Sequence, residues 1–122
     1  MKKTDRQLSL LSGTAVKTEK GYFYIKNNVR RPFPTRRVFK SWGFYKVVKA
    51  KEDQLKNYPI VGPLGFRDGT LIYCIADATY YIISNNKRVM IDSPDTLREH
   101  GLSMLDAIWV SKAERDLHGV VA

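Results

Sequence analysis

Runs of hydrophobic residues, each closed by polar turn residues, predict short strands in both halves of the chain. Aromatic and β-branched residues gather at 22–25 and at 80–83, a composition typical of strands. A pair of asparagines ends each run, and a further strand is predicted at 30–33 and at 88–91. Asparagine tolerates a positive φ better than most residues, so each pair predicts a two-residue hairpin turn.

Each predicted hairpin has a strand before it and a helix after it. The preceding strand begins at Gly13 in the first half and at Gly69 in the second, which completes a three-stranded meander in each half. Ser93 is then a candidate N-cap and Gly101 a candidate helix stop, with Thr35 and Gly43 in the same places in the first half. A Ser-x-x-Glu capping box at 111–114 predicts a last short helix.

The two halves follow one sequence plan. Residues 22–44 and 80–102 align without a gap and are identical at 6 of 23 positions. The identical pairs are Tyr22/Tyr80, Ile25/Ile83, Asn27/Asn85, Asn28/Asn86, Arg30/Arg88 and Gly43/Gly101. A repeat of this size buries little apolar surface alone, so we expect the copies to share a core. The predicted fold is α+β: two tandem repeats, each a three-stranded antiparallel β-meander followed by short helices, packed into one body.

The repeat sets the expected boundaries along the chain. These are an N-terminal arm at 1–12, repeat 1 at 13–58, a linker at 59–68, repeat 2 at 69–118 and a C-terminal tail at 119–122. We expect the arm to be a solvated terminus, although its three leucines could cover a neighbouring surface. The linker is apolar as well as Pro/Gly-rich, so we expect it to dock the two copies.

Composition restricts the class of protein further. The chain has 122 residues, of which 43% are hydrophobic, and no apolar run approaches the roughly 20 residues that span a bilayer. The N-terminal residues lack the continuous apolar segment of a secretory signal. A single cysteine excludes an internal disulfide framework. The chain is therefore compatible with synthesis and folding in a reducing cytoplasm, and we expect no membrane association.

The net charge of +9 is concentrated in the first half. Residues 15–58 carry 12 Lys/Arg and 3 Asp/Glu, whereas residues 69–118 carry 5 Lys/Arg and 7 Asp/Glu. The candidate binding residues are the cluster Arg30, Arg31, Arg36, Arg37 and Lys40 together with the interleaved Trp42. We interpret this cluster as a patch that docks on an acidic protein surface. A solvated face and a nucleic-acid site, with phosphate contacts and base stacking, are the alternatives.

No residue pattern predicts catalysis, a cofactor or a metal. His100 precedes the helix-stopping glycine and is expected to be a surface or capping residue, and His118 is expected to be solvated. Cys74 falls on a predicted strand and is expected to be a small core residue. The spacing of the carboxylates Asp92, Asp95 and Asp106 fits no known calcium loop.

The two halves resemble a repeat of bacterial cell-surface and secreted proteins and of bacteriophage virion proteins. Its pattern is Tyr-x-Ile-x-Asn-Gly-x-x-Arg-x-Ile-Pro-x-Pro, then Gly-Phe, then Val-Ser-x-x-Glu-Leu. The second half matches at Gly69-Thr70-Leu71-Ile72, Ile83, Asn85, Arg88, Ile91, Ser93-Pro94, Leu97, Gly101, Val110-Ser111 and Glu114. The first half matches at Gly13-Thr14, Ile25, Asn27, Arg31, Phe33-Pro34, Phe39, Ser41-Trp42-Gly43-Phe44 and Glu52. Asn28 and Asn86 depart from the turn glycine, and Arg36-Arg37 depart from the Pro-Glu helix start.

The resemblance implies a non-enzymatic, appended module that attaches to a surface or to its neighbours. Without a signal peptide, a phage particle is favoured over a secreted wall protein. We expect a structural or adaptor protein of a virion, a capsid or tail decoration or accessory protein, present in multiple copies and docked through its basic first repeat. The alternatives are a nucleic-acid-binding module and a cell-wall or glycan-binding module, which Trp42 could serve.

Overall fold

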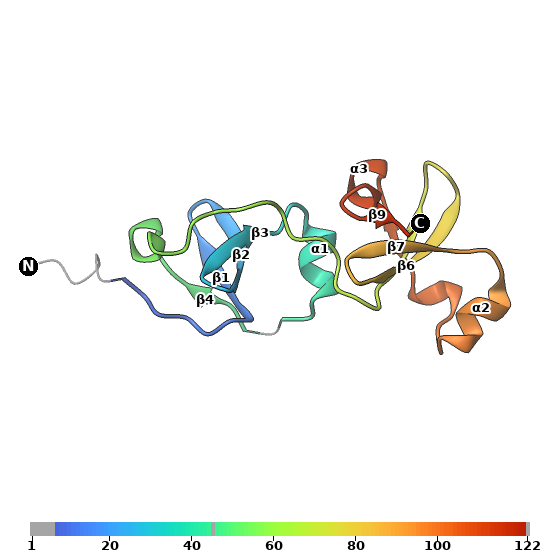
Figure 1. The fold of residues 1–122 in the computed structure, drawn as a ribbon, viewed down its shortest axis with the longest axis horizontal. Coiled ribbons are helices and arrows are strands. Elements are labelled where there is room, and N and C mark those ends of the chain that lie inside the picture. The colour runs from blue at the N-terminus through green and yellow to red at the C-terminus, as the bar shows by residue number, and fades with distance from the viewer. Residues whose placement is uncertain (1–6, 45, 122) are drawn as a thin grey trace, which may run out of the picture. The chain divides into compact units, whose positions relative to one another are not determined.

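The computed structural model describes residues 7–44 and 46–121, and the chain divides into two compact units, Met1–Leu64 and Gly65–Ala122. Figure 1 shows strands and short helices in both units, so the predicted α+β class is confirmed. The segment expected as a linker is divided between them at residue 64. Of the expected arm and tail, residues 1–6 and 122 lie outside the described residues.

The described part of unit 1 has a sheet of four strands in the order β3-β2-β1-β4. Its elements are β1 (Thr14–Thr18), β2 (Gly21–Lys26), β3 (Val29–Pro32), α1 (Arg36–Ser41), β4 (Val48–Lys49) and the 3₁₀ helix η1 (Glu52–Leu55). The strands β1, β2 and β3 pair antiparallel, as predicted. The strand β4 pairs parallel with β1 and was not predicted.

The described part of unit 2 has a sheet of five strands in the order β8-β5-β6-β7-β9. Its elements are β5 (Leu71–Cys74), β6 (Thr79–Ser84), β7 (Lys87–Ile91), α2 (Pro94–Glu99), the 3₁₀ helix η2 (Met104–Asp106), β8 (Ile108–Val110), α3 (Lys112–Arg115) and β9 (Gly119–Val120). The strands β5, β6 and β7 form the predicted meander. The strand β8 pairs parallel with β5, and β9 pairs parallel with β7. Neither strand was predicted. Figure 1 shows α2 and α3 on different sides of the β6–β7 hairpin.

The asparagine pairs form the turns that the sequence predicts. Asn27 and Asn28 have φ of 54° and 63°, and Asn85 and Asn86 have φ of 51° and 62°. Positive φ at both central residues defines the type I′ turn, whose twist matches that of the flanking strands. The chain thus reverses tightly between β2 and β3 and between β6 and β7, which fixes the register of both hairpins.

The predicted helix caps are also present. The side chain of Thr35 accepts a hydrogen bond from the backbone N–H of Val38, and Ser93 accepts one from Thr96. The predicted capping box at 111–114 opens α3. Each cap satisfies a backbone donor that the first helical turn leaves without an intrahelical partner.

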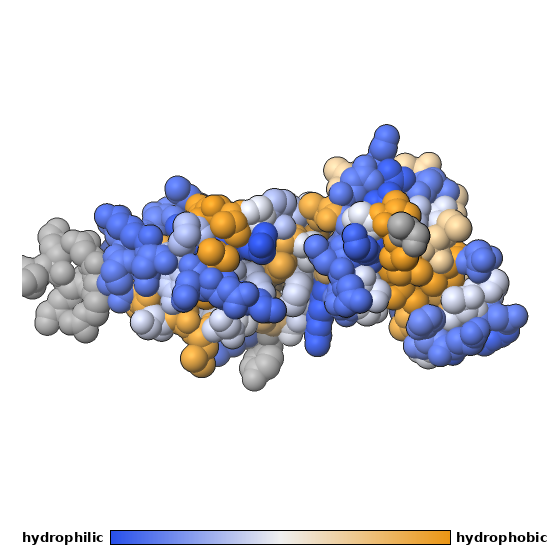
Figure 2. Space-filling model, in the orientation of Figure 1, coloured by the Kyte–Doolittle hydropathy of each residue, from blue (hydrophilic) through white to orange (hydrophobic). Residues whose placement is uncertain are grey.

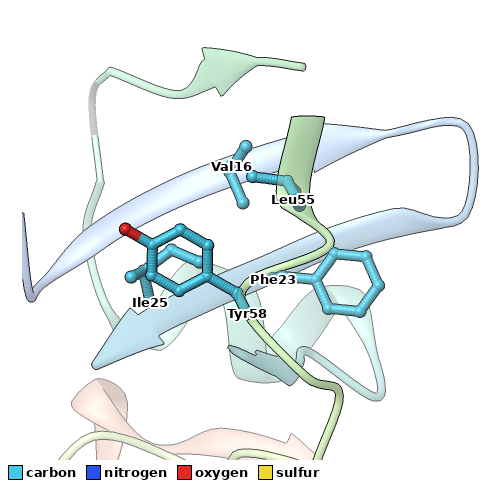
Figure 3. Packing of buried hydrophobic residues seen from close by; sticks show 5 residues of the cluster. All are labelled: Val16, Phe23, Ile25, Leu55 and Tyr58. Carbon is cyan, nitrogen blue, oxygen red and sulfur yellow. The ribbon is translucent and has the colours of Figure 1, made fainter. Parts of the chain in front are cut away.

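The core of unit 1 lies between one face of the sheet and the segment that contains η1. Figure 3 shows side chains from β1 and β2 pointing toward two from η1 and the residues after it. The cluster consists of Val16, Phe23, Ile25, Leu55 and Tyr58. Leu8 and Leu10 of the expected arm pack against this cluster, and the N–H of Leu10 donates to the hydroxyl of Tyr58 at 2.8 Å. These two leucines therefore extend the core of their own unit.

Both faces of the unit 2 sheet are covered. One face packs with α2 in the cluster Leu71, Ile82, Ile91 and Leu97. The fully buried side chains of this unit include Phe66, Ile72, Ile83, His118, Val110 and Cys74. Cys74 is thus the core residue that the sequence predicts. His118 was expected to be solvated, and that prediction is wrong, because its side chain is 0% exposed.

Among the residues that the structure describes, no helix has the length and apolar character needed to cross a membrane.

Candidate docking face of unit 1

The predicted binding residues divide into an exposed group and two that are partly or fully covered. Arg31, Arg36, Arg37 and Lys40 are exposed on β3 and α1, and we call these four residues the basic face. Trp42 is half-buried after α1, and Arg30 is only 5% exposed. The structure therefore brings four of the six predicted residues to the surface of unit 1.

Arg30 is a structural residue of unit 1. Its Nη1 and Nη2 donate to the two carboxylate oxygens of Glu52 at 2.8 Å each, and its Nε donates to the carbonyl of Tyr58 at 2.9 Å. The guanidinium also lies 4.7 Å from the ring centroid of Phe23. These contacts join β3 to η1 and to Tyr58, three residues after η1.

The hydrogen bonds from Arg30 also set the charge state of its partner. They lower the pKa of Glu52 below its ordinary value of 4.5, while partial burial opposes the shift and the hydroxyl of Thr18 adds to it. A bidentate pair of this kind is among the stronger side-chain interactions in proteins. Arg30 is thus committed to contacts inside the unit and is not available to a partner.

Arg88 has the corresponding place in unit 2. Its Nη1 donates to the carbonyls of Arg115 and His118 and lies 3.5 Å from a carboxylate oxygen of Asp116. In both units, then, an arginine on the third strand of the meander binds the segment that closes the unit. This shared role accounts for the identity of positions 30 and 88 without any external ligand.

Six half-exposed aromatic side chains lie on the opposite face of the unit 1 sheet from the core. We call them the aromatic cluster: Tyr22, Tyr24, Phe33, Phe39, Trp42 and Phe44. Tyr22 and Phe39 have ring centroids 4.7 Å apart, and Trp42 stacks on Phe44 with an interplanar angle of 6°. Packing among rings is favourable, but none of these six side chains is buried. Figure 2 shows hydrophobic residues at the surface of the molecule among hydrophilic ones.

Two hollows flank the contact between Tyr22 and Phe39. The larger, about 430 Å³, is lined by Gly21, Tyr22, Phe33, Pro34, Thr35, Arg36, Phe39 and Lys40. The smaller, about 220 Å³, is lined by Lys17, Tyr22, Phe39, Phe44, Val47 and Lys49. Each hollow has aromatic walls and two cationic side chains. Such a surface is complementary to a partner that presents carboxylates or phosphates next to flat or apolar groups.

The strand register explains how the lysines reach the same face as the aromatic rings. Lys17 pairs with Tyr22 on β2 and with Lys49 on β4, and paired residues of neighbouring strands point to one side of a sheet. The ammonium of Lys17 lies 5.4 Å from the ring centroid of Tyr22. Residues 20–51 contain no Asp or Glu, so no carboxylate of that segment offsets the positive charge of the face.

The histidines and carboxylates of the described residues do not form a catalytic or metal-binding group. No cluster of three or more His, Cys, Asp or Glu side chains in this part of the chain could hold a metal ion. His100 is exposed and forms the C-cap of α2. His118 accepts a hydrogen bond at Nε2 from Phe66 N–H at 2.8 Å, so the proton on Nδ1 faces the carbonyl of Asn86 at 3.0 Å. Burial lowers the pKa of His118.

Sequence reasoning missed the two hollows. They combine residues from β2, from the segment between β3 and α1, and from α1 and β4, and no local pattern shows that these segments meet. The interleaving of aromatic and basic residues over 17–49 was the available signal. Comparison with protein-family models, curated proteins and solved structures finds no match to this chain.

Proposed function

We propose that the protein is a non-enzymatic structural or adaptor protein of a bacteriophage particle, in which the basic face and the aromatic cluster of unit 1 dock on an acidic protein surface of the capsid or tail. The observation that carries this proposal is the exposed aromatic cluster with cationic side chains in both of its hollows. Half-exposed rings supply apolar contact area, and the charges steer the approach and fix the orientation.

We further propose that units 1 and 2 are tandem copies of one repeat. Each has a meander with a type I′ turn, a capped helix directly after it, and a later strand parallel to the first strand of the meander, β4 in unit 1 and β8 in unit 2. Arg30 and Arg88 close the two units in the same way. The virion assignment draws on the resemblance of this repeat to phage and cell-surface repeats, and it implies several copies per assembly.

Reversal of the basic face tests the docking proposal. The variant Arg31→Glu/Arg36→Glu/Arg37→Glu/Lys40→Glu leaves the buried Arg30 in place, so its circular dichroism and melting temperature are expected to stay close to those of the wild type. Co-sedimentation with purified particles should be lost, because like charges then face the acidic surface. Undiminished co-sedimentation of this variant would refute the proposal.

A matched control separates a specific face from a general loss of positive charge. Lys51 and Lys56 are exposed at the two ends of η1, which packs on the sheet face opposite the aromatic cluster, and they line neither of the two hollows. The variant Lys51→Glu/Lys56→Glu reverses two positive charges of unit 1 and should retain co-sedimentation. Equal losses per charge in both variants would indicate non-specific attraction.

A nucleic-acid-binding module is the second candidate. The ring of Tyr22 is 37% exposed and lines both hollows. A base could stack on such a ring while the cationic side chains of the hollows contact phosphates. A salt titration of single-stranded DNA binding distinguishes the candidates. Sub-micromolar affinity near physiological salt with a steep salt slope would favour nucleic acid. The cell-wall or glycan alternative relies on Trp42 as an exposed ring on which a sugar could stack. Trp42 is half-buried against Tyr24 and Phe44, which weakens this alternative.

A further inference from the structure

Unit 2 has a hollow in the same sequence positions as the larger hollow of unit 1. It measures about 140 Å³ and is lined by Tyr80, Ile91, Asp92, Ser93, Pro94, Leu97 and Met104. Six of these positions lie 58 residues after a lining residue of the unit 1 hollow: Tyr22, Phe33, Pro34, Thr35, Arg36 and Phe39. Both hollows therefore open between the second strand, the third strand and the capped helix of their unit.

The charge at these two hollows is inverted. Arg36 and Lys40 line the hollow of unit 1, whereas the charged residue that lines the hollow of unit 2 is Asp92. The segment 92–106, which includes α2 and η2, has four acidic residues and one basic residue. The five are Asp92, Asp95, Arg98, Glu99 and Asp106, and all are exposed. Arg98 pairs with Asp95 in its own helix, so the segment presents an excess of carboxylates to solvent.

The acidic segment also exposes large apolar side chains. Leu105 is 96% exposed, Met104 is 51% exposed, and the nearby Trp109 on β8 is 60% exposed. Apolar groups of this size on a charged surface commonly mark a contact site. Unit 2 thus offers aliphatic groups flanked by carboxylates, and unit 1 offers an aromatic hollow flanked by cations. The two surfaces are complementary in charge, and the exposed side chain of Leu105 is an apolar group that could enter a hollow of a partner.

We propose that the protein associates head to tail with a second copy of itself, the acidic segment 92–106 of one copy docking on the basic face and aromatic cluster of unit 1 of the next. Leu105 supplies the apolar group that enters the unit 1 hollow, and the carboxylates of the segment pair with Arg36, Arg37 and Lys40. The inference rests on the proposed role of the basic face and identifies a second copy of the chain as an acidic partner.

The contact joins two different surfaces, so it is heterologous rather than two-fold symmetric. A dimer as a whole retains one unused basic face, on one copy, and one unused acidic segment, on the other. Such contacts build rings when the rotation closes and open chains when it does not. Association should therefore continue beyond the dimer as the concentration rises, and salt should reverse it because exposed charges are screened.

Light scattering and sedimentation velocity on the nuclease-treated full-length chain test the inference. At low salt the weight-average mass is expected to rise with concentration above the monomer value of 14.0 kDa and to return to it at high salt. Arg36→Glu/Arg37→Glu and, separately, Asp92→Lys/Glu99→Lys should each weaken self-association at least tenfold. Acidic residues in the first turn of α1 and a lysine at the end of α2 suit the helix dipole, and Asp92 is exposed outside the helix. Both variants are therefore expected to fold.

Mixing the two variants is the decisive measurement. The first variant impairs the basic face and keeps the acidic segment, whereas the second variant impairs the acidic segment and keeps the basic face. Each should therefore be monomeric alone. An equimolar mixture restores the complementary pairing and should regain mass above the monomer. Leu105→Ser should weaken self-association without a change of charge, whereas Lys51→Glu/Lys56→Glu should leave it unchanged.

The inference is overturned if the wild type stays monomeric up to ~1 mM, where even weak specific contacts are populated, or if the mixture remains monomeric. It is also overturned if nuclease treatment abolishes the association, since nucleic acid then bridges the copies. These outcomes are separable from failure of the proposed function. Asp92→Lys/Glu99→Lys keeps the basic face intact and should still co-sediment with particles even where self-association is lost.

Discussion

Replacement of Arg30 by methionine should remove a large part of the stability of unit 1. Removing one partner of a buried ion pair typically costs about 3–5 kcal/mol, because the other charge is left without its counterion. The side chain of Glu52 is 16% exposed and keeps a hydrogen bond from Thr18, so we expect a value of about 3 kcal/mol at the lower end of that range. At about 0.05–0.15 kcal/mol per residue, a unit of roughly 60 residues has about 3–9 kcal/mol in total.

Each unit has one tryptophan, which makes the measurement specific. Urea unfolding followed by the fluorescence of Trp42 in a Trp109→Phe background reports on unit 1, and Trp109 is exposed enough for that exchange to be mild. The matched control is Arg31→Met, one position along the same strand, where an exposed side chain should change the free energy of unfolding by less than about 0.5 kcal/mol. Equal effects of the two substitutions would refute the assignment of Arg30 as a structural residue.

A double-mutant cycle and the pH dependence test the same pair further. Glu52→Met added to Arg30→Met removes the stranded charge, so the double variant should be more stable than Arg30→Met alone. Because the folded pKa of Glu52 lies below its ordinary value of 4.5, the pair stabilises unit 1 above about pH 4.5 and loses this contribution as the pH falls through the folded pKa. Strict additivity of the two substitutions would contradict a direct interaction.

Two further predictions concern the buried histidine of unit 2. Gly65→Ala should destabilise unit 2 by about 1–3 kcal/mol through overpacking, because a Cβ at this position would lie 2.5 Å from His118 Nε2. Gly62→Ala is the neutral control, since its Cβ would lie 3.7 Å from Arg31. Equal melting temperatures of the two variants would contradict the close contact at Gly65. Since burial lowers the folded pKa of His118 below 6.5, the unfolded chain binds the proton first, and the stability of unit 2 should fall by up to about 1.4 kcal/mol per pH unit as the pH drops below 6.5. Trp109 fluorescence in a Trp42→Phe background measures it, and a flat profile between pH 7 and pH 5 would exclude this linkage.

Local features of this fold could be predicted from the sequence because their causes are local. The asparagine turns depend on two adjacent residues, and each helix cap depends on a hydroxyl three residues before the backbone N–H it accepts from. The parallel strands β4 and β8 escaped prediction because they have two and three residues. Their pairing depends on β1 and β5 being already in place, and no periodicity emerges from so short a segment.

The burial of charged and polar side chains could not be predicted, because it depends on residues far away in the sequence. Arg30 and Arg31 are adjacent and chemically identical, yet the strand period of two sends them to opposite faces. The face that Arg30 occupies is covered by η1 with Glu52, which is 22 positions away in sequence. The burial of His118 depends likewise on Phe66, 52 positions away. The His118 ring lies so close to Gly65 that a side chain there would collide with it. The glycine at position 65 is thus the sequence feature that corresponds to this contact.

Helices α1 and α2 share the features that folding requires and differ in the charges of their first turns. Both follow a type I′ hairpin, both have a hydroxyl N-cap, and both bury one apolar side chain, Val38 in α1 and Leu97 in α2. The first turn of α2 holds Asp95, which suits the helix dipole, whereas α1 has two arginines and no acid there. Each such cation costs about 0.3–1 kcal/mol at a helix N-terminus. Under the docking proposal, contacts with an acidic partner would offset this cost.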